Sequence, residues 1–166
     1  MKQLILLLIL LLTNPIYSQI SYNDLMSISS EKMFKKVMIE NGYEFNGIED
    51  GSLSYGWEIQ KDSINGNKSS KWGQYRDNGE FVVYFSRNSL YNSFLNLEED
   101  YSDSEYDLIV KDIKKNCKYY DIMSRDVEGV IYDYVCYSCS ESKYKGKIGF
   151  MISEGWGYIG HFLIEE

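Results

Sequence analysis

Residues 23–48 read NDLMSISSEKMFKKVMIENGYEFNGI, and within this stretch the spacing of the apolar residues changes. As far as Asn41 the apolar residues recur every three or four positions, as they do on one face of an amphipathic helix. From Tyr43 they alternate with polar residues, which is the pattern of a half-buried strand. The stretch therefore predicts a helix over residues 23–41, capped by Asn23 or Asp24, that leads directly into a strand.

The same change of period occurs a second time along the chain. The segment SDSEYDLIVKDIKKN (102–116) carries an apolar helical stripe formed by Leu108, Ile109 and Ile113. Ser102 and Glu105 have the spacing of a capping box, and the segment ends in two lysines. We therefore expect a second amphipathic helix here, again followed by strands.

Each predicted helix precedes four segments with strand periodicity. The first set comprises residues 43–48, 52–59, 71–77 and 80–86, and the second comprises 118–123, 129–138, 145–153 and 155–164. Glycine-containing turns are predicted at 49–51, 77–79 and 153–155, and further turns at 124–128 and 140–144. The sequence thus predicts an α+β fold of two tandem α-β-β-β-β repeats, at about 22–88 and 102–166. The repeats would form one curved antiparallel sheet with the helices packed on one face.

Weak similarity between the two sets supports this repeat, since residues 34–41 align with 109–116 and Gly79 aligns with Gly155. The order of elements resembles that of the β-lactamase inhibitor protein family, in which two helix-plus-four-strand halves share one sheet. The resemblance covers most of the chain as topology, without a shared residue motif. It implies a protein that binds partners and catalyses nothing, such as an enzyme inhibitor or an envelope component.

The N-terminus has the three parts of a secretory signal. Lys2 precedes the apolar run LILLLILLL (4–12), which is followed by Pro15 and the small residue Ser18. We expect cleavage near Ser18 or Gln19, giving a signal peptide over 1–18 and a single domain over 19–166. No cysteine follows the apolar run, so no lipid or other stable membrane anchor is expected. The predicted location is periplasmic or extracellular.

The net charge of −8 makes nucleic acid and anionic membrane surfaces poor partners for this chain. Its aromatic residues instead suggest a surface for a protein or peptide partner in the cell envelope. All three tryptophans lie in predicted strands beside glycines, and tyrosines accompany them. The predicted binding residues are Trp57, Trp72, Trp156, Tyr55, Tyr75 and Tyr158, joined by Tyr84, Tyr132 and Tyr134. The alternative is that these rings fill the core beneath the helices, and strand alternation places some on each side.

Cys136 and Cys139 form a CxxC, a spacing found in redox centres and zinc sites. A redox CxxC normally lies at a helix N-terminus, whereas this one ends a predicted strand. A zinc site would need two more ligands, and the chain offers only Cys117 and His161. We therefore expect no metal and no cofactor. The favoured prediction is a disulfide between Cys117 and Cys136, with Cys117–Cys139 as the alternative.

Two further features could suggest other chemistry. His161 is the only histidine and lies in a predicted strand, where packing is a commoner role than catalysis. The acidic run 98–107 lacks the central glycine of a calcium loop, and we expect it to serve the helix N-terminus and solubility. The sequence favours an exported non-enzymatic binding or inhibitory module. The alternatives are an exported hydrolase or thiol oxidoreductase, or a structural envelope protein without a specific ligand.

Overall fold

The computed structural model describes residues 19–64, 66–87, 104–127 and 130–164. Within them, eight strands form one antiparallel sheet in the order β1-β2-β3-β4-β8-β7-β6-β5. The strands are β1 (Tyr43–Glu49), β2 (Ser52–Trp57), β3 (Lys71–Tyr75), β4 (Phe81–Ser86), β5 (Lys118–Val127), β6 (Val130–Ser138), β7 (Lys147–Ser153) and β8 (Trp156–Phe162). The predicted α+β class and the single antiparallel sheet are confirmed. The predicted signal peptide and residues 98–103 of the acidic run lie outside the described residues.

The centre of the sheet is the pair β4–β8, in which Val83 lies opposite Ile159. From this pair the neighbouring strands follow in descending chain order on both sides, to β1 at one edge and β5 at the other. Gly79 and Gly155 precede β4 and β8 with positive φ angles of 88° and 80°, which glycine adopts without steric cost. The predicted glycine turns therefore position the two central strands.

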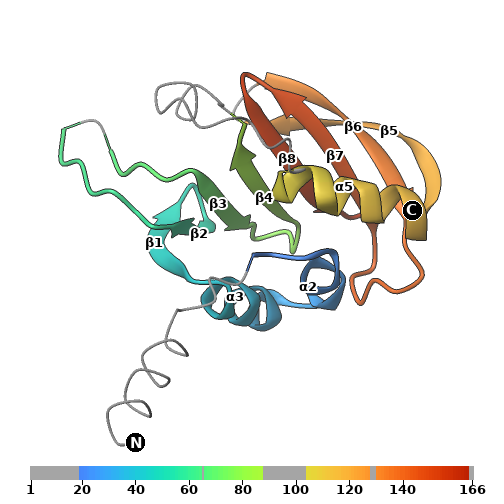
Figure 1. Cartoon of the computed structure of the whole chain (residues 1–166), viewed down its shortest axis with the longest axis horizontal. Helices are drawn as coiled ribbons and strands as arrows, with labels where there is room; N and C mark the ends of the chain where they lie inside the picture. Colours follow the sequence, from blue (N-terminus) through green and yellow to red (C-terminus); the bar gives the residue numbers. More distant parts are fainter. Residues whose placement is uncertain (1–18, 65, 88–103, 128–129, 165–166) are drawn as a thin grey trace, which may run out of the picture.

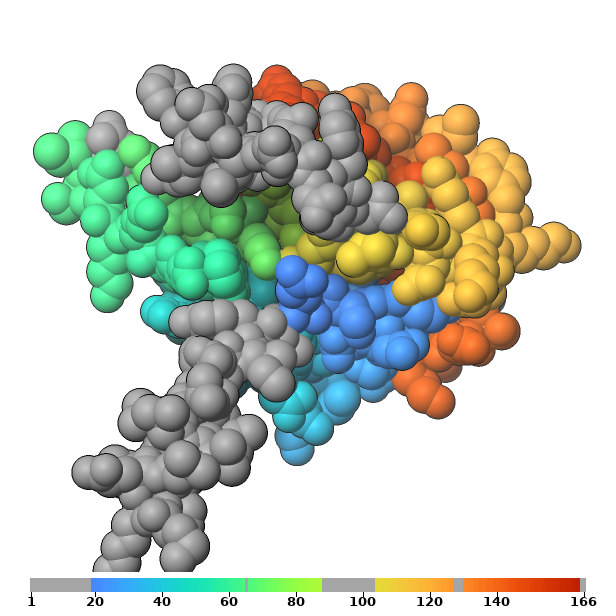
Figure 2. Space-filling model, viewed as in Figure 1, coloured from blue at the N-terminus to red at the C-terminus, as the bar shows by residue number. Residues whose placement is uncertain are grey.

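The helices among the described residues cover one face of this sheet, as Figure 1 shows. They are α2 (Tyr22–Ser27), α3 (Glu31–Glu40) and α5 (Glu105–Asn116). The contacts of α3 are with β1 and β3, whereas those of α5 are with β4 and β8. Since α2 touches both other helices, the three form one layer, whose blue and yellow parts adjoin in Figure 2. No helix among the described residues is long and apolar enough to cross a bilayer.

The prediction of one continuous helix over 23–41 was wrong, because the helix is interrupted at Ile28. This residue adopts an extended conformation (φ −70°, ψ 114°) and is fully buried. Serines begin both helices: Ser21 caps α2 in a capping box with Asp24, and Ser30 caps α3 by accepting from the Met33 backbone N–H. An N-cap serine has an extended backbone, and its hydroxyl accepts a hydrogen bond from the first turn of the helix that follows it. Ser30 therefore begins a new helix at a point where the spacing of the apolar residues alone predicts that one helix continues.

The cap of the other helix also differs from the prediction. Ser104, rather than Ser102, caps α5, and its hydroxyl accepts from the backbone N–H of Asp107. Ser102 lies outside the described residues. Helix α5 ends at Asn116 with two lysines in its last turn, as predicted. Its buried face comprises Tyr106, Ile109, Val110 and Ile113, while the predicted core residue Leu108 is 45 % exposed.

The turn predicted at 124–128 was also misplaced. Strand β5 continues to Val127, which lies opposite Val130 in the β5–β6 hairpin. A register shift between Tyr119 and Asp121 marks a bulge near the start of the hairpin. The β5–β6 hairpin is therefore longer than the alternation of side chains predicted. Its turn end, near Val127 and Val130, lies beyond the predicted end of the first strand.

Candidate binding face

The face of the sheet opposite the helices carries a row of large side chains across its centre. Trp72, Tyr84, Tyr158 and Met151 lie opposite one another on β3, β4, β8 and β7. Because alternate residues of a strand point to the same side, these four share the face that the helices leave open. Trp72, Tyr84 and Tyr158 are half-buried, so the row is accessible from outside.

Three tyrosines stack along this face. The Tyr84 and Tyr158 ring centroids are 5.5 Å apart with an interplanar angle of 20°, and those of Tyr158 and Tyr132 are 6.4 Å apart at 23°. Trp156 meets Tyr84 edge-on at 5.7 Å. We call Tyr84, Tyr158 and Tyr132 the tyrosine stack. Such packed rings form a rigid contact surface, because little side-chain entropy remains to be lost on binding.

Tyr132 reaches Tyr158 although β7 separates their strands in the sheet. The reason is that β6 pairs with β7 only from Val135 to Tyr137, which leaves the far half of the β5–β6 hairpin free to curl over the open face. Arg125 of the edge strand β5 accordingly reaches the residues that flank the central strands β4 and β8. Its guanidinium donates to the backbone oxygen of Leu163 (2.9 Å) and lies 3.9 Å from the Glu80 carboxylate.

A small apolar cluster lies beneath the curled hairpin. It consists of Val82, Tyr134, Cys136, Met151 and Phe162, which are at most 9 % exposed. The Phe162 ring fits against Gly160 and Gly149, where a Cβ would meet ring carbons at 2.4 and 3.1 Å. These glycines therefore make room for an aromatic ring on the open face. Tyr84, Tyr132 and Tyr158 of the tyrosine stack pack against this buried cluster.

A groove of about 320 Å³ follows the stack. Its lining comprises Gln74, Arg76, Val82, Tyr84, Val130, Tyr132, Tyr134, Met151, Glu154 and Tyr158. At Gln74 and Arg76 the groove meets a second hollow of about 410 Å³, which is also lined by Glu49, Asp50, Ser52, Asp77, Asn78 and Asp126. Together the two hollows run from an aromatic wall to an acidic end.

The predicted binding residues divide between the two faces. Trp72, Trp156 and Tyr158 lie on the open face, where Tyr84 and Tyr132 join them. Tyr55 and Tyr75 instead pack against Phe34 of α3, and Trp57 lies on the same helix-covered side beneath Lys71. The three residues on the helix side contribute to the core, so they do not form one surface with the others.

The groove also contains residues that sequence reasoning missed, namely Gln74, Arg76, Val82, Val130, Met151 and Glu154. Gln74 and Val82 carry a readable signal, because they lie two residues from Trp72 and Tyr84 in alternating strands. Arg76 and Glu154 lie just outside strands, where alternation gives no direction. No sequence signal places Tyr132 against Tyr158, since that contact depends on the curl of the hairpin.

The disulfide connects Cys117 with Cys139, so the favoured pairing of Cys117 with Cys136 was wrong. Lys118 lies opposite Ser138 in the hairpin, which brings the Cα atoms of Cys117 and Cys139 to 4.5 Å. Cys139 packs with the core on the helix side, whereas Cys136 belongs to the cluster on the open face. Burial raises the pKa of the Cys136 thiol to about 11, so it remains protonated. The CxxC therefore spans both faces and does not form a dithiol pair.

His161 is buried between Phe81 and Tyr144 on the helix side, with ring centroids 4.6 and 5.2 Å away. Neither ring nitrogen has a hydrogen-bond partner, and burial lowers the pKa of His161 to about 3. A catalytic histidine needs access to substrate and an orienting partner, and this one has neither. Within the described part of the chain, no group of three or more His, Cys, Asp or Glu side chains could hold a metal ion.

No protein-family model matches this chain, and no curated protein or solved structure is significantly similar to it.

Proposed function

We propose that this protein is an exported, non-enzymatic binding or inhibitory module that holds a protein or peptide partner on its open sheet face. The observation that carries the proposal is the tyrosine stack along the groove of about 320 Å³. Tyrosines already packed against each other offer a large amphipathic area at a small entropic cost, as in many protein-binding surfaces. The buried cluster beneath them supports this role because it holds the rings in place before a partner arrives.

The charge of the groove indicates which partners fit. Carboxylates line its acidic end and Glu154 lines its aromatic part, whereas Arg76 is the one cationic residue among the described lining. The guanidinium of Arg76 already lies 3.9 Å from the Glu80 carboxylate. An extended segment with an aromatic or aliphatic residue beside a lysine or arginine would therefore match both parts of the groove.

The arrangement of the halves supports the proposed kinship with β-lactamase inhibitor-like proteins. Each proposed repeat runs from a helix through four strands, and β4 meets β8 at the centre with Val83 opposite Ile159. The glycine turns at Gly79 and Gly155 have matching backbone conformations. We propose on these grounds that the fold is a tandem repeat. The disulfide supports export, since such bonds persist in oxidising compartments.

Peptide capture tests the function directly. Immobilised protein would be incubated with a proteolytic peptide mixture from cell-envelope proteins, and retained peptides would be quantified by mass spectrometry. The variant Tyr84→Ala/Tyr158→Ala should retain at least roughly tenfold less peptide, because aromatic anchors dominate such interfaces. Retained peptides should be enriched in lysine and arginine, and their retention should fall as salt rises.

The matched control is Tyr119→Ala/Tyr120→Ala, which removes two tyrosines that are 53 % and 44 % exposed on the edge strand β5. It should retain peptide as the unaltered protein does. Equal loss in both variants, or no retention by the unaltered protein, would contradict the proposed binding face. The second outcome would favour a structural envelope protein.

A further inference from the structure

A buried carboxylate oxygen without a donor lies at the start of α5. The Glu105 side chain is only 8 % exposed, and its Oε2 accepts from the Lys71 ammonium at 2.5 Å. Its other oxygen, Oε1, is buried and has no hydrogen-bond partner. Leaving a charged acceptor buried and unsatisfied is costly, so this oxygen is suited to accept a hydrogen bond from a further donor.

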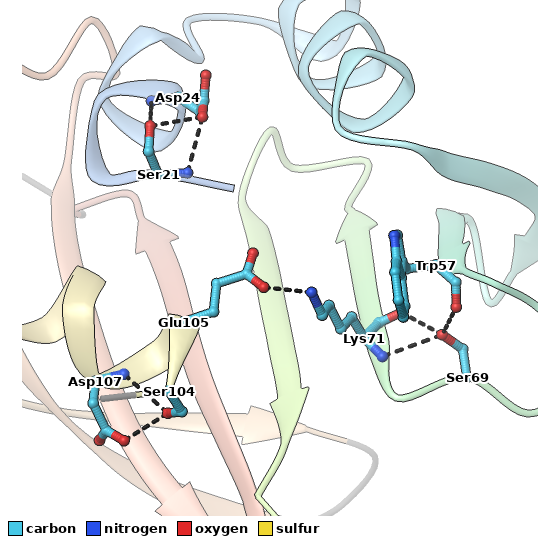
Figure 3. Close-up of polar contacts among 8 residues, drawn as sticks. All are labelled: Ser21, Asp24, Trp57, Ser69, Lys71, Ser104, Glu105 and Asp107. Atoms are coloured by element: carbon cyan, nitrogen blue, oxygen red, sulfur yellow. Dashed lines mark hydrogen bonds and ion pairs between the residues drawn. The ribbon is translucent and has the colours of Figure 1, made fainter. Parts of the chain in front are cut away.

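Lys71 cannot supply that donor without giving up its present contacts. Its Nζ lies 4.4 Å from the centroid of the Trp57 ring, which holds the ammonium on the Oε2 side of Glu105. Figure 3 shows this geometry: one oxygen of Glu105 faces Lys71, and the other points away from Lys71, upwards in this view. The unsatisfied oxygen is therefore not turned towards the ammonium group of Lys71.

Gln19 and Glu105 line a common cavity of about 210 Å³, and its other lining residues are Ser70, Lys71, Phe85, Ser86, Ser104 and Tyr106. The chain is fixed immediately after Gln19. Ile20 is 2 % exposed, and Ser21 is held by hydrogen bonds to the Asp24 carboxylate from its backbone N–H (2.9 Å) and its hydroxyl (2.7 Å). Since consecutive Cα atoms are about 3.8 Å apart, the backbone nitrogen of Gln19 stays close to this cavity.

We propose that cleavage of the Ser18–Gln19 peptide bond creates an α-ammonium group on Gln19 that pairs with Oε1 of Glu105 and locks the N-terminus into the fold. The cut is a hydrolysis by a signal peptidase. Water is consumed, the carboxylate remains on Ser18 of the released leader, and the amine of Gln19 takes up a proton. The inference rests on the predicted signal peptide and is independent of the binding face.

The new ammonium group suits the site better than the uncut peptide. An ammonium offers three donors and a positive charge, whereas the peptide nitrogen offers one neutral N–H. Glu105 would then lie between two cations, Lys71 on Oε2 and the N-terminus on Oε1. Removal of the leader would therefore tighten the contact between α5 and the start of α2, which lie far apart in the sequence.

The first test uses the full chain, expressed with its leader in a cell that exports it, followed by mass spectrometry of the exported product. The proposal expects a product that begins at Gln19. A product that begins at Ile20 or later, or one that keeps residues before Gln19, would overturn it, because either leaves no ammonium at this position.

The second test is a thermodynamic cycle on chains that contain every described residue. One chain starts at Gln19, freed from a fusion by a protease that leaves no extra residue, and the other carries one added methionine. The added residue should lower the melting temperature by about 4 °C, as expected for loss of a charge-assisted hydrogen bond. In the Glu105→Gln background the difference should vanish, whereas in the control Glu44→Gln background it should persist. An equal decrease in all backgrounds, or none, would overturn the pairing.

The third readout distinguishes the pair from a general effect on stability. An N-terminal glutamine cyclises when its neutral amine attacks the side-chain Cδ, forming an N–Cδ bond and releasing ammonia. An ammonium held by Glu105 is not a nucleophile, so cyclisation of the chain that begins at Gln19 should be several-fold slower than in Glu105→Gln. The loss of ammonia is followed by mass spectrometry under conditions in which both proteins are folded. Equal rates would contradict the proposal.

Discussion

The two faces of the sheet are formed by the same strands, yet they differ in how completely they are covered. On the helix side, Phe34 of α3 contacts Tyr55, Tyr75 and Phe81, and this core is closed by three helices. On the open side, the cover formed by the described residues is the curled end of one hairpin, and the tyrosine stack remains half-buried. The comparison suggests that side chains on the first face mainly stabilise the fold, whereas the exposed ones on the second are available for a partner.

Removing the ring of Phe34 should give the largest effect. Phe34 is fully buried, and Phe34→Ala should lower the free energy of unfolding by about 3–5 kcal/mol, because it leaves a cavity among the rings of Tyr55, Tyr75 and Phe81. Tyr158→Ala on the open face should cost clearly less, about 1–2 kcal/mol, since Tyr158 is only half-buried. Urea unfolding of both variants measures the difference. Equal losses would refute the idea that side chains on the helix-covered face stabilise the fold more than those on the open face.

The cysteines at the end of β6 allow the two faces to be compared directly, because Cys139 packs on the helix side and Cys136 on the open side. Cys117→Ala/Cys139→Ala should lower the stability by about 2–4 kcal/mol, because the disulfide closes a loop between residues 22 positions apart. Cys136→Ala removes a buried sulfur from the other face and should cost about 1–2 kcal/mol. Thiol labelling should find one reactive cysteine, and only after unfolding, because burial raises the pKa of the Cys136 thiol to about 11. Three labelled thiols in the unfolded, unreduced protein would disprove the disulfide.

The contrast between the faces also shows what a sequence can and cannot reveal. Local signals suffice for the strands: alternation and glycine turns such as Gly79 and Gly155 predict all eight near their observed positions. They also suffice for the end of α5. Alternation divides the residues of a strand between two sides, but it does not say which side the helices cover. For this reason Tyr55 and Tyr158 could not be assigned to different faces from the sequence.

Other features depend on geometry that leaves no local mark. The bulge between Tyr119 and Asp121 changes which side each residue of β5 faces, and so a disulfide partner chosen by alternation alone is uncertain. The contact between Tyr132 and Tyr158 depends on how far β6 pairs with β7. The break at Ile28 depends on a competition between a serine cap and an apolar stripe, which propensity does not decide.

Acid should weaken the covered face through His161. Its folded-state pKa of about 3 lies below the ordinary value of 6.5, because burial disfavours the charged ring. The contribution of the neutral ring is therefore complete above pH 6.5 and decreases as the pH falls towards 3, since only the unfolded chain binds the proton. The loss is on the order of 2 kcal/mol between pH 6.5 and 5.

His161→Leu is the control for this prediction, because the other acidic and basic groups titrate alike in both proteins. Its free energy of unfolding should depend less steeply on pH between 6.5 and 5. Urea titrations at several pH values measure both slopes. Parallel slopes would show that His161 is accessible to protons in the folded state.

The smallest effect concerns the residue that ties the hairpin over the open face. Arg125→Leu removes the hydrogen bond to the Leu163 backbone and the cation above the Phe162 ring, 5.2 Å from its centroid. We expect a loss of about 1–2 kcal/mol, since Glu80 keeps Arg76 and the Leu163 N–H as partners. Arg87→Leu, which breaks a more exposed pair with Asp107, should cost at most about 1 kcal/mol.

Amide hydrogen exchange should separate the two variants: in Arg125→Leu the far half of the β5–β6 hairpin should exchange faster while β2 and β3 remain protected. If exchange instead rises equally throughout the sheet, Arg125 stabilises the whole fold and does not hold this hairpin in particular.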